Sequence, residues 1–418
     1  MRDTPIEQKL RHNYLVNLAD GGFFGFAIGA SSFSAILPLF VARFTDSAVL
    51  IGLITAIHNV GWQLPQLFLA RWIATLTRFK PWVLKLTIHE RVPFLGLALI
   101  AGLIFTQKPV LSLILTFVML AWQGLGSGFA ANVWQNMIGK IIPGSIRATF
   151  FGIQSSASNL GGSIGAVISG ILLDRLPSPL DFVLCFLITV GLMGVSWFFL
   201  ALTREEANPP PTAEDVPQPT AELSRHILRS DASFKWFLVA RNLFQFGTMA
   251  FSFYIIYAVL KLGMSEVEAG FMAATLNITL VIANPVLGWL ADHWNIQAVM
   301  TLGAVASLLS ALVAFLAPSL GWFYLVIVLQ GFANVTFWTI GIAFTLQFGT
   351  DRQRPVYIGL ANTLIAPSTI LAPLVGGWLA DAINYQATFP VSAGLSGLTA
   401  LIFLLFVKNP PLRKAEAG

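Results

Sequence analysis

Long runs of apolar residues recur along the whole chain and are separated by short polar stretches. Most runs approach or exceed the roughly 20 residues with which an α-helix crosses a ~30 Å hydrocarbon layer. We therefore predict twelve membrane-spanning helices, at residues 14–42, 49–73, 82–106, 109–136, 148–173, 179–202, 234–261, 267–291, 296–317, 320–346, 356–380 and 386–407.

A polar stretch, residues 203–233, divides these spans into six and six. It contains Pro209, Pro210, Pro211, Pro217 and Pro219, a composition typical of a flexible or partly extended linker. We predict a six-helix bundle at 1–202, a cytoplasmic linker at 203–233 and a second six-helix bundle at 234–418.

The two halves are related by internal repetition. An offset of 207 residues pairs Gln123-Gly124 with Gln330-Gly331, Arg147 with Arg354, Gly152 with Gly359, Gly170 with Gly377 and Asp174 with Asp381, and an offset of 218 pairs Gly52 with Gly270 and Asn59 with Asn277. The predicted fold is thus an all-α integral membrane protein of two parallel six-helix pseudo-repeats. Parallel repeats are typical of transporters that open to alternate sides, although duplication can also be purely structural.

Composition restricts the chemistry. Apolar residues make up 56% of the chain and charged residues only 10%, against roughly 25% charged in soluble domains. Twelve spans leave no room for a separate catalytic domain, and no spacing demands a catalytic pair, so we predict neither enzymatic activity nor a cofactor. The single cysteine, Cys185, excludes a disulfide framework and a thiolate metal cluster, and we predict no metal site.

The net charge of +5 arises from basic residues in loops, mainly those on one side of the membrane. Arg43, Lys108, Arg175 and Lys261 fall in the opposite loops. This asymmetry predicts cytoplasmic N- and C-termini in a multi-pass protein of the plasma (inner) membrane, and the scattered charge argues against nucleic acid as a partner. Because twelve helices can enclose a cavity alone, we expect a monomer in the lipid bilayer.

Three local motifs carry a family resemblance. "GWLADHWN" (288–295) follows span eight, while the loop after span two keeps Arg78 and Lys80 but has Ala74 in place of the motif Asp. "WQGLGSG" (122–128) and "GSIGAVISG" (162–170) lie in spans four and five. With these motifs the chain resembles the major facilitator superfamily. The resemblance implies alternating access by two bundles around a cavity lined mainly by spans 1, 2, 4, 5, 7, 8, 10 and 11. Leu120, Ala166 and Ser169 depart from the motifs and weaken an interpretation as a proton-antiporting drug exporter.

Charged residues inside spans are functional candidates because they are costly in a bilayer. Asp20 in span one and Arg241 in span seven lie at similar depths, so they could bind a charged solute or each other. The alternative is that Arg241 reaches the headgroups and Asp20 pairs locally. Gln245 continues a polar stripe that begins at Arg241, which favours a role in substrate binding.

Further polar positions are candidate substrate contacts. Span ten places Gln330, Asn334 and Trp338 on one helix face, which suits a small amphipathic or sugar-like solute. The other candidates are His58, Asn59, Gln63, Gln154, Asn159 and Asn277. Some of these residues will serve only to bridge helices. His58 also has the chemistry to exchange protons, but a lone histidine is more often a packing residue.

Span three holds the densest charge in the membrane: Lys85, His89, Glu90 and Arg91. Local pairing that anchors the bundle is favoured over a proton relay, and the sequence leaves both open. At the membrane edge, Asp292 is the motif carboxylate and Arg147 stands at the start of span five. We predict that they form a lock that closes the cytoplasmic gate.

These features predict a secondary active transporter that moves a small organic solute by alternating access, with protons as a candidate coupling ion. A translocase for a lipid or lipid-linked substrate on the same fold is the alternative. The sequence leaves open the substrate, the direction of transport and the coupling ion.

Overall fold

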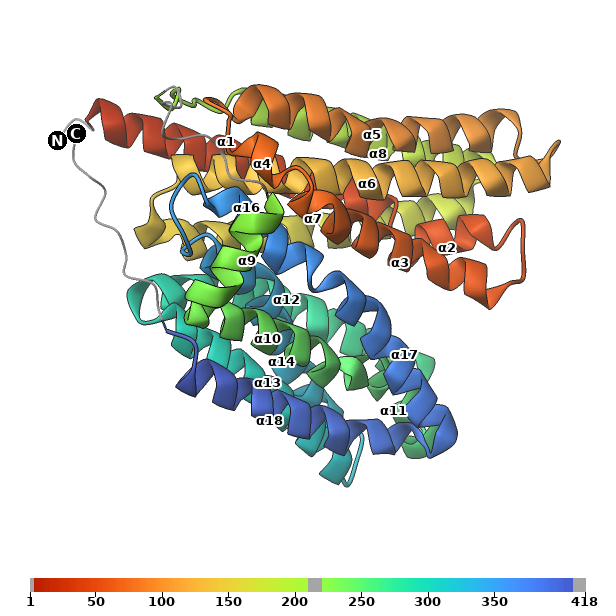
Figure 1. Cartoon of the computed structure of the whole chain (residues 1–418). Coiled ribbons are helices and arrows are strands. Elements are labelled where there is room, and N and C mark those ends of the chain that lie inside the picture. Colours follow the sequence, from red (N-terminus) through yellow and green to blue (C-terminus); the bar gives the residue numbers. More distant parts are fainter. Residues whose placement is uncertain (1–3, 210–219, 409–418) are drawn as a thin grey trace. The chain divides into compact units, whose positions relative to one another are not determined.

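The computed structural model describes residues 4–209 and 220–408, which fold into helices joined by short turns, with no strand among these residues (Figure 1). Ten helical segments in this part of the chain are long and apolar enough to cross a membrane. They match predicted spans three to twelve: α5 (Lys80–Leu103), α6 (Pro109–Ile141), α7 (Arg147–Arg175), α8 (Leu180–Ala201), α10 (Ala232–Gly247) with α11 (Tyr254–Leu262), α12 (Glu266–His293), α13 (Ile296–Leu316), α14 (Trp322–Val335) with α15 (Gly341–Thr345), α16 (Arg354–Thr363) with α17 (Ala366–Ala382), and α18 (Thr388–Leu405).

The first two predicted spans are more irregular. Span one consists of α1 (Pro5–Ala30) and α2 (Ile36–Val41); span two consists of α3 (Ala48–Gln63), the 3₁₀ turn Leu64–Leu67 and α4 (Ala70–Ile73). Helix α1 begins at Pro5, nine residues before the predicted span, because Thr4 and Glu7 form a capping box around its first turn. In span two, Pro65 lies where α3 gives way to the 3₁₀ turn, and proline cannot donate the next helical hydrogen bond.

Three other spans are interrupted. A 3₁₀ turn, Met249–Ser252, separates α10 from α11, and a π-helical turn, Thr336–Ile340, separates α14 from α15. Pro367 stands in the first turn of α17, which explains why α16 does not continue through it. Within the predicted linker, residues 220–230 form the helix α9 (Thr220–Ser230), whereas Pro210, Pro211, Pro217 and Pro219 lie outside the described residues.

The internal repeat is visible in the packing. In the first half α1 packs on α8, α5 packs on α6 and α8, and α3 packs on α6. In the second half α10 packs on α18, α13 packs on α14 and α18, and α12 packs on α14. Span by span these are the same pairs, so two six-helix repeats of one design are confirmed.

The chain forms two compact units that do not follow the sequence halves throughout. Unit 1 contains Met1–Ile142, Ala157–Gln218 and Asp351–Thr363; unit 2 contains Pro143–Ser156, Pro219–Thr350 and Leu364–Gly418. Each unit therefore holds one short segment from the other sequence half. We call residues 143–156 the first exchanged segment and residues 351–363 the second exchanged segment. They occupy equivalent positions in the repeat, at the starts of spans five and eleven.

Each unit has an aromatic core and tight glycine contacts. Phe40, Phe94 and Phe186 are buried in unit 1, and Tyr254 and Phe323 in unit 2. In unit 1, α1 lies against the later part of α7 through glycines. A Cβ at Gly29 would lie 2.0 Å from the carbonyl oxygen of Gly162, and one at Gly25 would lie 2.2 Å from Ser158 Oγ. Spans one and five therefore approach closely through small residues.

Candidate functional site

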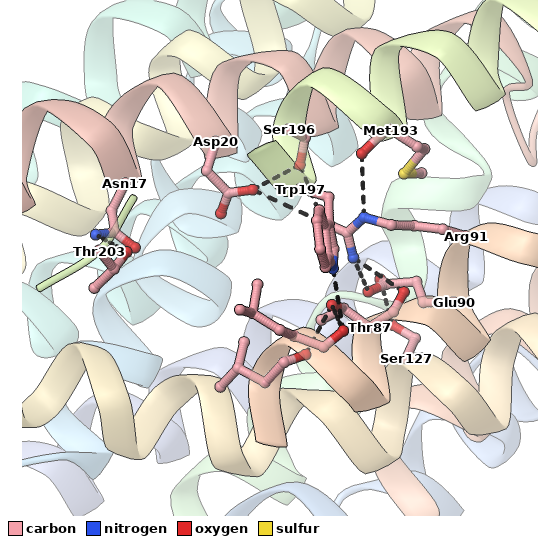
Figure 2. A network of polar contacts seen from close by, with 12 residues as sticks. Asn17, Asp20, Thr87, Glu90, Arg91, Ser127, Met193, Ser196, Trp197 and Thr203 are labelled. Atoms are coloured by element: carbon pink, nitrogen blue, oxygen red, sulfur yellow. Dashed lines mark hydrogen bonds and ion pairs between the residues drawn. The ribbon is translucent and has the colours of Figure 1, made fainter. Parts of the chain in front are cut away.

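A buried polar network joins four helices of unit 1 (Figure 2). Asp20 on α1 forms an ion pair with Arg91 on α5, at 3.8 Å between Oδ1 and Nη2. Ser196 on α8 connects them, because its hydroxyl donates to Asp20 Oδ1 at 2.6 Å and accepts from Arg91 Nη2 at 3.1 Å. The ionic partner of Asp20 is therefore Arg91, which is the local pairing that the sequence left as an alternative.

Glu90 completes this network. Its Oε2 lies 3.5 Å from Arg91 Nη1, and its Oε1 accepts from Ser127 on α6 at 2.9 Å. Arg91 also donates to the backbone carbonyls of Thr87 and Met193, at 3.1 and 3.3 Å. Span three thus ties α1, α5, α6 and α8 together through charged groups inside the bundle.

Arg241 is held by aromatic rings in unit 2. The residue is only 1% exposed, and its guanidinium carbon lies 5.7 Å from the Phe237 ring centre and 5.3 Å from that of Phe337. Cation–π attraction of this kind gains strength when both groups are removed from water. Arg241 therefore does not reach toward the headgroups; it places a fixed positive charge inside unit 2.

The π-helical turn of span ten lies next to this arginine. Phe337, which contacts Arg241, packs edge-on against Trp338 with ring centres 5.1 Å apart. Thr339, in the same turn, donates to Asn284 Oδ1 of α12 at 2.6 Å and contacts Ser155 of α7 at 3.3 Å. Single π turns often occur at functional sites because they redirect side chains locally.

Span two contributes amides and a histidine to unit 1. The His58 ring stacks on Phe33 at 4.0 Å, and its Nδ1 lies 2.9 Å from Gln123 Oε1. Gln63 is fully buried, and among the described residues neither its amide nitrogen nor its amide oxygen has a hydrogen-bond partner. A buried, unsatisfied amide is costly and is usually matched by a polar ligand or water.

The structure divides the predicted substrate contacts between the units. Unit 1 holds Asp20, His58, Asn59, Gln63 and Asn159, and unit 2 holds Gln154, Arg241, Gln245, Asn277, Gln330, Asn334 and Trp338. Gln154 is buried, Asn277 is exposed and bonds back to the carbonyl of Ala273 at 3.1 Å, and the buried Oε1 of Gln330 has no partner among the described residues. Their roles in binding stay predictions.

The first exchanged segment is held by Asp292. The Asp292 carboxylate accepts from the backbone N–H groups of Ala148 and Thr149, at 3.1 and 2.6 Å, at the start of α7. A carboxylate at this position satisfies free helical N–H groups and meets the positive end of the helix dipole. Arg147 is adjacent but donates to the carbonyl of Leu346, at 3.4 Å. Asp292 thus contacts the predicted segment through backbone amides beside Arg147, and the lock and its gating role stay predictions.

The second exchanged segment is held by neutral groups. Asn132 on α6 donates to the carbonyls of Gln66 and Pro355, both at 2.9 Å. Asn362 donates to Gln66 Oε1 at 2.8 Å, and Thr363 contacts the backbone near the end of α3. These amides form the unit 1 counterpart of the Asp292 contact.

The described start of the linker lies across one end of unit 1. Glu205 accepts from the backbone N–H groups of Phe79 and Lys80, at 2.9 and 2.7 Å, and forms an ion pair with Lys140 at 2.9 Å. Glu206 forms an ion pair with Lys9, and this ammonium holds the pKa of the Glu206 carboxyl below its usual range. These contacts fasten residues 205–206 to the loop that precedes α5.

Within residues 4–209 and 220–408, no three His, Cys, Asp or Glu side chains gather as a metal-binding group. The chain does match a family model described as Major Facilitator Superfamily, over residues 21–261 and 237–418. The chain belongs to the major facilitator superfamily. It is a multi-pass membrane protein with that family's transporter fold.

Solved structures of this superfamily share the fold over nearly the whole chain. The fucose:proton symporter FucP of E. coli is 17% identical with a TM-score of 0.74, covering 95% of this chain and 98% of that one. The human organic anion transporter MFSD10 is 14% identical with a TM-score of 0.70, covering 96% and 100%. At these identities the likeness concerns the fold alone.

Sequence relatives are distant. The sodium-dependent phosphate transport protein 1 of Arabidopsis thaliana chloroplasts is 23% identical over 401 residues, which cover 89% of this chain and 74% of that protein. The MFS-type transporter VdtG of Byssochlamys spectabilis is 31% identical over 85 residues. That match covers 20% of this chain and spans only 14% of the relative.

Several structurally important residues carry no signal in the sequence. Asn132, Ser155 and Thr339 are uncharged and lie within apolar spans, so nothing in their local pattern separates them from ordinary packing residues. The repeat offset of 207 does point to the two exchanged segments, since it pairs Gly152 in the first with Gly359 in the second.

Proposed function

We propose that this protein is a secondary transporter that moves a small polar or anionic organic solute across the plasma membrane by alternating access. In this proposal it works as a monomer, both termini are cytoplasmic, protons are the coupling ion, and no nucleic acid takes part. Membership of the superfamily supports the class of protein, and the contacts described above support the details.

The exchange of the segments 143–156 and 351–363 carries the proposal. Each segment belongs to one sequence half and packs in the unit formed mainly by the other half. For the cytoplasmic side to open, both segments must then leave their present partners. The two parts of the chain that move against each other are residues 1–202 and residues 234–418. The linker 203–233 connects them.

The contacts that hold the exchanged segments are few enough to break reversibly. Asp292 caps the first segment through two charge-assisted hydrogen bonds, and a helix cap of this kind is worth about 0.5–2 kcal/mol in total. Asn132 and Asn362 make neutral bonds to the second segment, each worth about 0.5–1.5 kcal/mol. Totals of this size fit a two-state equilibrium that substrate binding can shift.

Arg241 supports the choice of substrate class. It places a positive charge beside Trp338 and the Asn284–Thr339 pair within unit 2, so a carboxylate, phosphate or hydroxyl-rich solute finds donors and an aromatic wall together. The fucose and organic anion transporters that share the fold act on solutes of this kind, as their names state.

The deciding experiment locks the first exchanged segment. Ser155 Oγ and Thr339 Oγ1 lie 3.3 Å apart, so Ser155→Cys with Thr339→Cys in a Cys185→Ser background should form a disulfide. We first identify a solute by thermal stabilisation of purified protein against sugars, organic anions, amino acids and phosphate, in parallel with Arg241→Lys. A ligand at 100 times its Kd stabilises by about 2.7 kcal/mol.

Transport of that solute into liposomes should stop when the disulfide forms and return on reduction, while the transport rate of each single-cysteine variant should be the same before and after oxidation. Transport that continues in the oxidised double variant would contradict alternating access through this segment. If no soluble solute stabilises the protein and lipid substrates do, the substrate class proposed here is wrong and the lipid translocase is favoured.

A further inference from the structure

The network of Figure 2 contains more acid than base. Asp20, Glu90 and Arg91 have side chains that are 8%, 9% and 10% exposed, so all three lie inside the bundle. If all three were ionised, the cluster would carry one uncompensated negative charge. An unbalanced charge at such a site is strongly unfavourable, and uptake of one proton removes it.

In the described part of the chain, no other charged side chain contacts the cluster. On α5, Lys85 lies over the Trp82 ring at 4.8 Å, and the indole N–H of Trp122 donates to His89 Nδ1 at 3.2 Å. The polar side chains that contact Glu90 from α6, and Asp20 and Arg91 from α8, are the hydroxyls of Ser127 and Ser196. The Met193 carbonyl of α8 and the Phe24 ring of α1 also contact Arg91, and neither is charged. The balance is therefore set by two carboxyl groups and one guanidinium.

The donor and acceptor roles identify which carboxyl takes the proton. Ser196 accepts from Arg91 and donates to Asp20 Oδ1, so the guanidinium polarises this hydroxyl as a donor, which favours an ionised Asp20. Ser127 has no such constraint. Its hydroxyl can donate to an ionised Glu90 or accept from a protonated one across the same 2.9 Å contact. Glu90 is the carboxyl whose surroundings accommodate either state.

We propose that Glu90, with Ser127 as its hydrogen-bond partner, is a proton-binding site whose occupancy is set by the Asp20–Arg91 ion pair. While Asp20 contacts Arg91, Glu90 keeps its proton. When Asp20 moves away or becomes neutral, Arg91 compensates Glu90 instead, the Glu90 O–H bond breaks, and the proton leaves to water. Because Asp20 lies on α1 and Glu90 on α5, motion of α1 is linked to proton release; use of this link in coupling rests on the proposed transport function.

Infrared spectroscopy of the purified protein tests the site without any substrate. The C=O stretch of a protonated carboxyl is resolved from the bands of carboxylates and of the backbone. We expect wild type at neutral pH to show a protonated-carboxyl band that disappears at alkaline pH. The band should be absent from Glu90→Gln. It should also be absent from Asp20→Asn, because there Arg91 balances an ionised Glu90.

Two controls separate this mechanism from simple loss of an acid. Asp174→Asn removes an exposed carboxyl of α7 and should leave the band unchanged. Ser127→Ala should keep the band but shift its frequency, because the proton loses its acceptor.

A wild-type protein without the band at any pH, or a band that survives Glu90→Gln, would overturn the proposal, as would a Glu90→Gln chain that fails to fold, since a neutral amide closely mimics the protonated acid. A negative infrared result leaves the disulfide test of transport unaffected, and the reverse also holds.

Discussion

The two exchanged segments are equivalent in the repeat but are held by different chemistry. In unit 2 the Asp292 carboxylate accepts from the N–H groups of Ala148 and Thr149. In unit 1 the offset of 218 places Ala74 at the position of Asp292, and the offset of 207 places Pro355 at the position of Ala148. Unit 1 therefore has neither the carboxylate nor one of the two N–H groups of this contact.

These two differences are complementary, because each removes the need for the other group. An Asp opposite Pro355 would lack one donor, and a free N–H opposite Ala74 would lack its acceptor. Instead, Val356 N donates to Gln353 O at 2.9 Å, and the Pro355 carbonyl accepts from Asn132. The first segment is thus held by charge and the second by neutral amides, so the two contacts should respond differently to mutation.

The largest effect is expected from the repeat-matched glycines. A Cβ at Gly152 would lie 2.2 Å from the carbonyl oxygen of Asn284, and one at Gly359 would lie 2.7 Å from the Cα of Leu67. Gly152→Val and Gly359→Val should each displace their segment, at a cost of about 1–3 kcal/mol or more, with Gly152→Val the more severe because the obstacle is a backbone carbonyl. Thermal unfolding of the purified variants measures this.

Gly170→Val and Gly377→Val are the matched controls, since a Cβ at either position meets nothing within 4 Å. Equal destabilisation by all four substitutions would show that the close contacts at the exchanged segments are unimportant.

Asn132→Ala should have the next largest effect, confined to the second segment. It removes three buried hydrogen bonds, one of them from Asn136, and leaves the carbonyls of Gln66 and Pro355 without their donor, at about 1–3 kcal/mol. Reaction of a Thr363→Cys variant with a soluble maleimide, in a Cys185→Ser background, should therefore accelerate. Unchanged reactivity at this position, with acceleration at Ser155→Cys instead, would mean that Asn132 does not hold the second segment.

Asp292→Ala should loosen the first segment by about 0.5–2 kcal/mol, the usual loss when a helix cap is removed. Asp292→Asn should be milder, because its single amide oxygen still accepts from one of the two N–H groups, of Ala148 or Thr149. Maleimide labelling of Ser155→Cys should rise roughly 2- to 30-fold in the alanine variant. If asparagine and alanine behave alike, the charge, and not the hydrogen-bond geometry, holds the segment.

The smallest expected effect, that of restoring the missing groups in unit 1, tests most directly why the two exchanged segments are held differently. Ala74 lines the same small cavity as Asp351 and Arg354, so Ala74→Asp can approach the start of α16. Pro355→Ala restores the missing N–H group. We expect each change alone to be nearly neutral or unfavourable, and the pair to show a favourable coupling of about 0.5–1 kcal/mol in a double-mutant cycle of thermal unfolding. If the changes in the free energy of unfolding simply add, the two differences from unit 2 are not linked.

Much of this architecture follows from the sequence. Span length and the two repeat offsets predicted a membrane protein of two six-helix repeats, because crossing a bilayer requires long apolar helices whatever their tertiary contacts. The three motifs predicted the superfamily. Prediction was least accurate where helices are interrupted. Pro65 and Pro367 mark two of the breaks, but the π turn at 336–340 carries no proline or other local signal.

The sequence identified candidate site residues by their type, but it did not identify the residues that they contact. Charge inside a span singled out Asp20, Arg241 and the span-three cluster, since burying charge in a bilayer is costly for any fold. That Asp20 contacts Arg91, and that Arg241 is enclosed by phenylalanines, depends on helix rotation and proximity, which periodicity alone does not specify.

The sequence by itself determined that this chain is a twofold-repeated membrane protein, because apolar length and internal repetition are properties of the chain read in order. Only the tertiary structure decided that residues 143–156 and 351–363 pack in opposite units and that Asp292 binds the backbone amides of Ala148 and Thr149. Backbone N–H groups are the same in every sequence, so a contact made through them becomes visible only when the helices are brought together.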